Sequence, residues 1–150
     1  MSRYTSAMIA GFAATVVLSI LMVVKASMGL MPRLDVIHML TQMMSTRLGL
    51  PATPIVGWGA HFVIGTVIWG VLFASLVNII PGKTAVTKGM VFGAGAWVLM
   101  MLIPLPMAGA GLFGLSLGPM APVMTLILHL IWGSVLGGIF QRLVSRARTN

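Results

Sequence analysis

The sequence predicts an all-α integral membrane protein with four transmembrane helices. Hydrophobic residues make up 59% of the 150 residues and charged residues only 7%, too few polar side chains to cover the surface of a water-soluble domain. Four apolar runs also approach or exceed the roughly 20 residues that a bilayer core requires. These runs are Ala7 to Val24, Ile55 to Ile80, Thr84 to Ile103 and Val123 to Val144.

The distribution of positive charge predicts the orientation of these helices. The chain has nine Lys and Arg residues against one acid. In a four-span topology Arg3, Lys83, Lys88, Arg142, Arg146 and Arg148 fall on one side, and Lys25, Arg33 and Arg47 on the other. Because cytoplasmic loops collect Lys and Arg, we expect both termini in the cytoplasm. The expected partners are the lipid bilayer and other membrane subunits or further copies of the chain, and not nucleic acid.

An internal repeat predicts how the helices are related. The pattern PxxPxxxxxxHxxxG[ST]VxxG occurs twice with an offset of 68 residues, and it aligns His61 with His129, Gly65 with Gly133 and Gly70 with Gly138. A weaker match joins residues 11–22 to residues 89–100. We therefore expect one domain over residues 1–150, with repeat halves of about 1–80 and 81–150. The halves would be two hairpins in the same orientation, related by an axis along the membrane normal.

The two loops on the outer side differ in character. Between the first two spans, Val36, Leu40, Met43 and Leu48 recur at near-helical spacing, which predicts an amphipathic helix in the membrane interface. The loop at 104–122 carries no charge and is rich in glycine. Such a loop is expected to pack across the mouth of the bundle or against a partner.

Small residues recur four apart on three of the predicted spans. Such faces let helix backbones approach closely in lipid. They are formed by Ala10 and Ala14, by Gly89 and Gly93, and by Gly133 and Gly137.

The two aligned histidines are candidate site residues, because an ionisable side chain inside a membrane is costly. Three interpretations remain open. His61 and His129 would form a structural pair hydrogen-bonded to hydroxyls or carbonyls, with Thr125 as a partner for His129. They would alternatively ligate one b-type haem, with Gly65 and Gly133 leaving room for the macrocycle or admitting a neighbouring helix. The third interpretation is a metal-ion or substrate pathway.

A second cluster suggests copper. His38, Met39 and Met43 lie together in the predicted outer helix, and thioether with imidazole suits Cu(I). The alternative is that these methionines fill space in the packing.

Four stretches of the chain resemble a family of small bacterial membrane proteins known only as a domain of unknown function. The resemblance covers nearly the whole chain and implies a four-helix inner-membrane fold without supplying an activity. The stretches are MGLMPRLDVIHMLTQMM, GWGAHFVIGTVIWG, PMAGAGLFGL and APVMTLILHLIWGSVLGG.

The residues themselves argue against catalysis. Asp35 is the only acid and cysteine is absent, so no paired carboxylate, intramembrane acid or thiol nucleophile exists. We therefore expect a non-enzymatic small subunit or assembly factor of a larger inner-membrane complex. The alternatives are a haem-carrying electron-transfer protein that uses His61 and His129, and a copper-handling or small-solute membrane protein.

Overall fold

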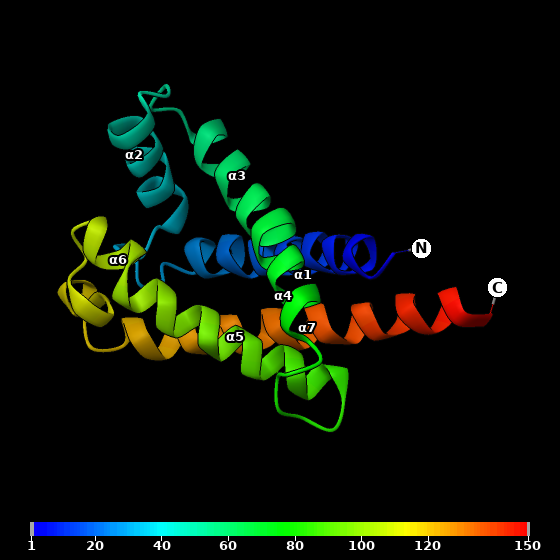
Figure 1. Ribbon diagram of the computed structural model, residues 1–150. Coiled ribbons are helices and arrows are strands. Elements are labelled where there is room, and N and C mark those ends of the chain that lie inside the picture. Colours follow the sequence, from blue (N-terminus) through cyan, green and yellow to red (C-terminus); the bar gives the residue numbers. More distant parts are fainter. Residues whose placement is uncertain (1, 150) are drawn as a thin grey trace.

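The computed structural model describes residues 2–149 of the chain, apart from the side chains of Arg148 and Thr149, and consists of helices and their connections (Figure 1). Four helical stretches are long and apolar enough to cross a membrane: Arg3–Ser27, Pro54–Leu76, Ala85–Met107 and Ala121–Ala147. The predicted number of spans is confirmed, and the chain is a multi-pass membrane protein. Of the predicted cytoplasmic cations, the side chain of Arg148 lies outside the described residues.

The element order is simple. It runs α1 (Arg3–Ser27), α2 (Val36–Leu48), α3 (Pro54–Val63), the π-helix η1 (Ile64–Ile68), α4 (Trp69–Leu76), α5 (Ala85–Leu102), α6 (Pro104–Met107), the 3-10 helix η2 (Leu112–Leu117) and α7 (Ala121–Thr149). Figure 1 shows that α1 begins and α7 ends at the same end of the molecule, while α2 and α6 lie at the other end. The second span is thus built from α3, η1 and α4.

Local sequence explains where several helices begin. Side-chain oxygens of Ser2, Asp35 and Thr84 accept hydrogen bonds from the first turns of α1, α2 and α5, which satisfies backbone donors that a helix leaves free. Pro54 stands in the first turn of α3, where its missing N–H has no cost. Pro54, the second proline of the first PxxP pair, thus marks the entry into the second span.

Glycine brings α5 and α7 into backbone contact. A Cβ added to Gly89 would meet the carbonyl oxygen of Gly133, and a Cβ added to Gly137 would meet that of Ala85. A Cβ on Gly93 would likewise strike the backbone of α7. The predicted small-residue faces of these two helices are confirmed.

The first hairpin repeats these contacts with one extra residue. Gly65 and Gly70 of the second span lie against the backbones of Gly11 and Ala7 in α1. Gly11 and Ala7 are four residues apart, as are Gly89 and Ala85, but Gly65 and Gly70 are five apart. The π-helix η1 spans this interval, and a π-turn holds one residue more than an α-turn.

This extra residue corrects the predicted alignment of the two halves. Sequence identity aligns Gly70 with Gly138, whereas the backbone contacts make Gly137 its counterpart. Beyond η1 the offset is therefore 67 residues, which pairs Phe73 with Phe140. These two rings contact each other edge to face, with centroids 5.3 Å apart.

Aromatic rings fill the bundle toward the end where α1 begins. Phe73 is fully buried and also contacts Phe92, with ring centroids 5.2 Å apart. Phe92 in turn stacks with Trp132 of α7. Large rings from α4, α5 and α7 thus close this half of the interior.

The other half is covered by α2. Its buried residues Ile37 and Thr41 pack on the start of α3, where a Cβ added to Gly57 would meet both of them. The helix is present as predicted, but its packed face differs from the predicted apolar stripe: Leu48 is 66% exposed. The remaining residues of that stripe, Val36, Leu40 and Met43, line a cavity beneath α2.

The uncharged loop after α5 forms the rest of this cover. Its buried residues are Leu105 in α6, Ala110 between the two helices and Gly114 in η2. Leu105 and Ala110 belong to a small core with Met101, against which Met39 of α2 packs. The loop thus packs on α5 and α7 and meets Met39 of α2, while its expected packing against a partner stays a prediction.

Candidate ligand cavity

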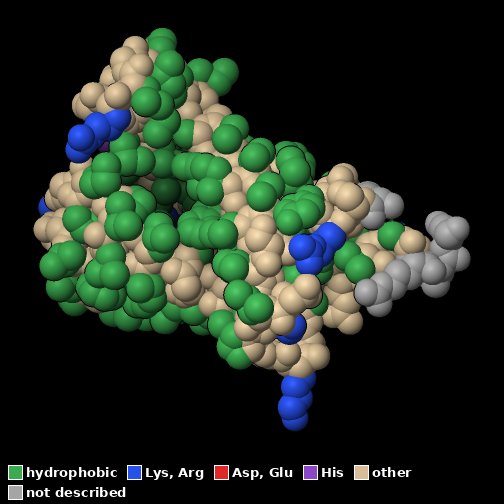
Figure 2. All heavy atoms as spheres, viewed as in Figure 1, with side chains coloured by type: hydrophobic (Ala, Val, Ile, Leu, Met, Phe, Trp, Pro, Cys, Tyr) green, Lys and Arg blue, Asp and Glu red, His purple; other side chains and the backbone are tan. Residues whose placement is uncertain are grey.

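A cavity of about 660 Å³ occupies the interior beneath α2. Every helix of the chain except η2 contributes to its wall. Figure 2 shows a hollow that is surrounded mainly by hydrophobic side chains. Compared with Figure 1, which has the same view, the hollow lies below α2 and α3 and above α5 and α6. Its volume lies within the range of small-molecule sites.

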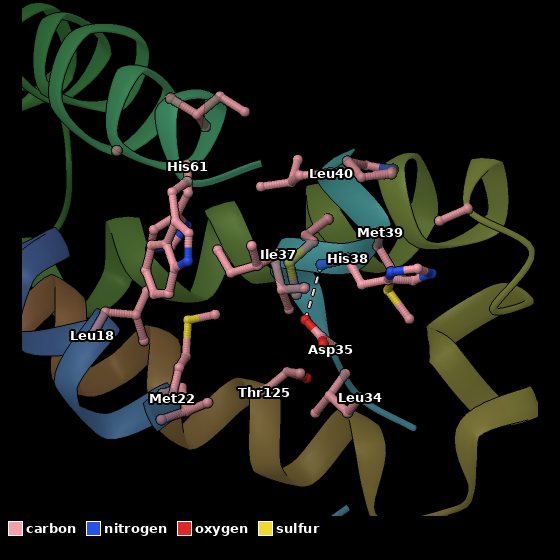
Figure 3. Close-up of a pocket in the computed structure, with 18 of the residues that line it drawn as sticks. Leu18, Met22, Leu34, Asp35, Ile37, His38, Met39, Leu40, His61 and Thr125 are labelled. Atoms are coloured by element: carbon pink, nitrogen blue, oxygen red, sulfur yellow. Dashed lines mark hydrogen bonds between the residues drawn. The ribbon is translucent and has the colours of Figure 1, made fainter. Parts of the chain in front are cut away.

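His61 enters this cavity from α3. Figure 3 shows its side chain extending toward Leu18 and Met22 of α1. The residue is 9% exposed, and its Nε2 atom is buried without a hydrogen-bond partner. The indole of Trp58 lies edge-on to the imidazole at 5.9 Å between centroids. Among the described residues, neither a hydroxyl nor a backbone carbonyl pairs with this Nε2.

His129 lines the same cavity from α7. Its Nδ1 lies 2.8 Å from the carbonyl oxygen of Thr125, and since a carbonyl only accepts, Nδ1 carries the proton. In the neutral ring Nε2 then has a free lone pair. Thr125 is the predicted partner residue, and of the two kinds of acceptor left open for it the backbone carbonyl makes the contact.

The Thr125 hydroxyl has other partners. It donates to the carbonyl of Ala121 at 2.7 Å and accepts from Nε1 of Trp97 at 3.0 Å. Trp97 therefore fixes the α7 turn that holds His129, a contact between α5 and α7 that sequence reasoning did not find.

The glycines of the repeated motif serve helix packing. A Cβ on Gly65 would collide with the hydroxyl of Thr15, and one on Gly133 with the carbonyl of Gly89. Of the two interpretations of these glycines, the structure therefore supports the admission of a neighbouring helix. Gly65 also contributes to the cavity wall.

The charged groups at the cavity are already engaged. Lys25 donates from Nζ to the carbonyl oxygens of Met31 and Leu34, at 3.2 and 2.6 Å. Oδ1 of Asp35 accepts from the backbone N–H of His38 at 2.9 Å (Figure 3). These hydrogen bonds hold the start of α2 in place over the cavity.

The predicted copper residues occupy the cavity's outer wall. His38, Met39 and Met43 all line it, but His38 is exposed and Met39 packs against the core of Met101 and Leu105. Within residues 2–149 no three His, Cys, Asp or Glu side chains form a metal-sized group. Copper binding by these residues stays a prediction, and the contacts of Met39 show a packing role.

Three tryptophans of the cavity wall were not recognised from the sequence. Trp58, Trp69 and Trp132 line it together with the histidines. A signal was available: Trp58 precedes His61 by three residues and Trp132 follows His129 by three, which places each on the same helix face as its histidine.

Comparison with known proteins matches this four-span architecture to one family. The DUF6789 family, described as a family of unknown function, matches residues 1–150. The chain belongs to this family. No curated protein and no solved structure matches the DUF6789 chain. The family resemblance inferred from the sequence therefore holds at the level of a family of unknown function.

Proposed function

We propose that this DUF6789 chain is a non-catalytic membrane protein that holds a small molecule in the histidine-lined cavity and acts as a small subunit or assembly factor in a larger inner-membrane complex. The observation that carries the proposal is the entry of His61 and His129, from different helices, into one cavity. A purely structural histidine is expected to have its nitrogens paired, and Nε2 of His61 is not.

The surface favours an accessory role. At the α6 end, Leu112, Leu115 and Met120 are 62%, 59% and 57% exposed. These side chains lie in the connection between two membrane spans, where a partner protein would cover them. Asp35, the only acid, caps α2, which leaves no carboxylate pair for acid–base catalysis.

The finer architecture of the proposal is a duplicated hairpin. The contact pairs Gly11–Gly65 and Gly89–Gly133 are equivalent in the two halves, which supports an origin from two parallel repeats. Superposing residues 55–63 on 123–131, ahead of the π-helix, is expected to relate the hairpins by an axis near the membrane normal. The proposed topology has both termini in the cytoplasm and α2 in the outer interface.

Co-purification tests whether the cavity holds a small molecule. Leu99 of α5 is exposed and lines the cavity, while its neighbour Val98 is similarly exposed and does not. Leu99→Trp is expected to place an indole in the cavity and fill part of it. Val98→Trp adds the same indole outside the cavity. Mass spectrometry of organic extracts should find a small molecule with the wild type and Val98→Trp and much less with Leu99→Trp. Equal recovery from all three, or none from the wild type, would contradict the proposal.

A b-type haem is the second candidate for the bound group. The Nδ1–H of His129 points at a backbone carbonyl, an arrangement common for metal-ligating histidines. His61 and His129 would together hold the haem iron. The propionates of haem would need cations, however, and Lys25 is already hydrogen-bonded to two carbonyls. Absorption spectra of the purified chain, oxidised and reduced, decide this candidate, because His61→Leu and His129→Leu would each remove the haem bands.

A further inference from the structure

The cavity beneath α2 opens at the surface of the molecule between helices that belong to two different spans. α3 packs on α1 and α2, and α5 packs on α7, while the cavity lies between α3 and α5 and takes wall residues from both. The hollow in Figure 2 has hydrophobic side chains around it. A molecule dissolved in the bilayer can therefore enter without crossing water.

The wall selects an uncharged ligand. Among the described lining residues, the ionised side chains are Lys25 and Asp35, and both are occupied by contacts within the chain. A phosphate headgroup would be buried without a free cation, which is expensive. The remaining wall is mainly apolar, supplied by Leu, Met, Ala, Trp, Pro, Ile and Val.

Two imidazole nitrogens supply polar contacts from different helices. Nε2 of His61 on α3 is buried without a partner, and Nε2 of His129 on α7 is left unprotonated by the Nδ1 contact. A ligand with oxygens on two edges of one ring would match both. Trp58, Trp69 and Trp132 in the same wall suit a flat ring, since aromatic faces and edges stack on such a group.

We propose that the cavity binds a membrane-soluble quinone or quinol, with its ring between His61 and His129 and its apolar tail leaving between α3 and α5. This inference rests on the proposed small-molecule function and names its ligand class. The His61 ring would meet one ring oxygen. His129, fixed with Nε2 unprotonated, would accept a hydrogen bond from a quinol hydroxyl.

Tryptophan fluorescence provides the test, because three of the chain's four tryptophans line the cavity and quinones quench indole emission. The purified chain in detergent is titrated with a benzoquinone that carries a ten-carbon alkyl chain. We expect saturable quenching in the wild type. His61→Leu and His129→Leu should each weaken binding by about tenfold, as expected for loss of one buried hydrogen bond. His61→Gln, which keeps a hydrogen-bonding group, should recover part of the affinity.

Matched controls separate the possible outcomes. Ser134→Ala removes another intramembrane polar group, one that bonds to Leu130 and does not line the cavity, and it should bind like the wild type. The same alkyl chain on a benzene ring without oxygens should fail to compete. Wild-type affinity in His61→Leu, or full competition by the oxygen-free analogue, would overturn the inference. A different co-purified molecule, such as haem, would overturn the quinone but leave the proposed function standing, whereas an empty cavity would overturn both.

Discussion

At the residue scale, buried polar atoms show where the two hairpins are joined. Thr15 of α1 is fully buried, and its hydroxyl accepts a hydrogen bond from Nε1 of Trp132 in α7 at 3.3 Å. Within a membrane neither group can turn to water for a substitute partner. This contact therefore sets the position of α1 against α7 at the base of the cavity.

Thr15→Val is expected to destabilise the protein by about 1 kcal/mol, because it keeps the shape and leaves the Trp132 N–H without an acceptor. Unfolding in a denaturing detergent measures the loss. The double variant Thr15→Val with Trp132→Phe should cost less than the sum of the single changes, since the orphaned donor is then gone. Strict additivity would mean that the two side chains do not interact in the membrane.

The same scale shows what the sequence can predict of the site. The common spacing of Pro and His predicted that His61 and His129 would be equivalent, and both do line one cavity. Thr125 was identified because it lies one turn before His129, yet the choice between its hydroxyl and carbonyl depended on Trp97 from another helix. Contacts between distant segments leave no local pattern, so this part could not be predicted.

At the element scale, the π-helix η1 is the main departure from the repeat. It directly follows the α3 segment that carries His61 and contains Thr66, whose hydroxyl oxygen is buried without a partner. π-turns often mark functional sites. The local sequence of η1 resembles that of the equivalent α7 turn, so the extra residue became visible only through the spacing of the glycine contacts.

Deleting Val67, a lipid-exposed residue of η1, is expected to leave the bundle assembled. The second span would then have the four-residue glycine spacing that α7 already uses between Gly133 and Gly137. Deleting Val135 from α7 is the matched control. It rotates the following residues by about 100° and moves Gly137 and Phe140 away from their contacts.

Size-exclusion elution and heat stability in detergent measure both deletions. We expect the Val67 deletion to elute and melt close to the wild type, and the Val135 deletion to aggregate. Aggregation of both proteins would show that the bundle needs the extra residue of η1 in order to assemble.

At the scale of the whole molecule, one end of the bundle is packed and the other is hollow. Phe73, Phe92 and Phe140 fill the end where α1 begins, and α2 with α6 covers the cavity at the opposite end (Figure 1). The four spans were predictable because length and hydropathy alone define them. The cavity was not predictable, because it depends on the packing of α2 against Gly57 and on the separation of α3 from α5.

The asymmetry of charge follows the same division and leads to a prediction of topology. Arg3, Lys83 and Arg142 belong to the end where α1 begins and α7 ends, while Arg33 and Arg47 belong to the covered end. Because Lys and Arg accumulate in the cytoplasm, we expect α2 and η2 to face outward. The chain contains no cysteine, so a single introduced cysteine can be labelled without reaction at any native thiol.

Exposed serine and threonine positions make the test direct. Thr46 in α2, Ser116 in η2 and Ser145 near the end of α7 are all exposed. A membrane-impermeant maleimide applied to intact spheroplasts should label Thr46→Cys and Ser116→Cys, and should label Ser145→Cys only after lysis. The opposite pattern would reverse the topology and place the covered end of the cavity on the cytoplasmic side. Labelling of all three before lysis would instead mean that the positive-charge asymmetry does not orient this bundle.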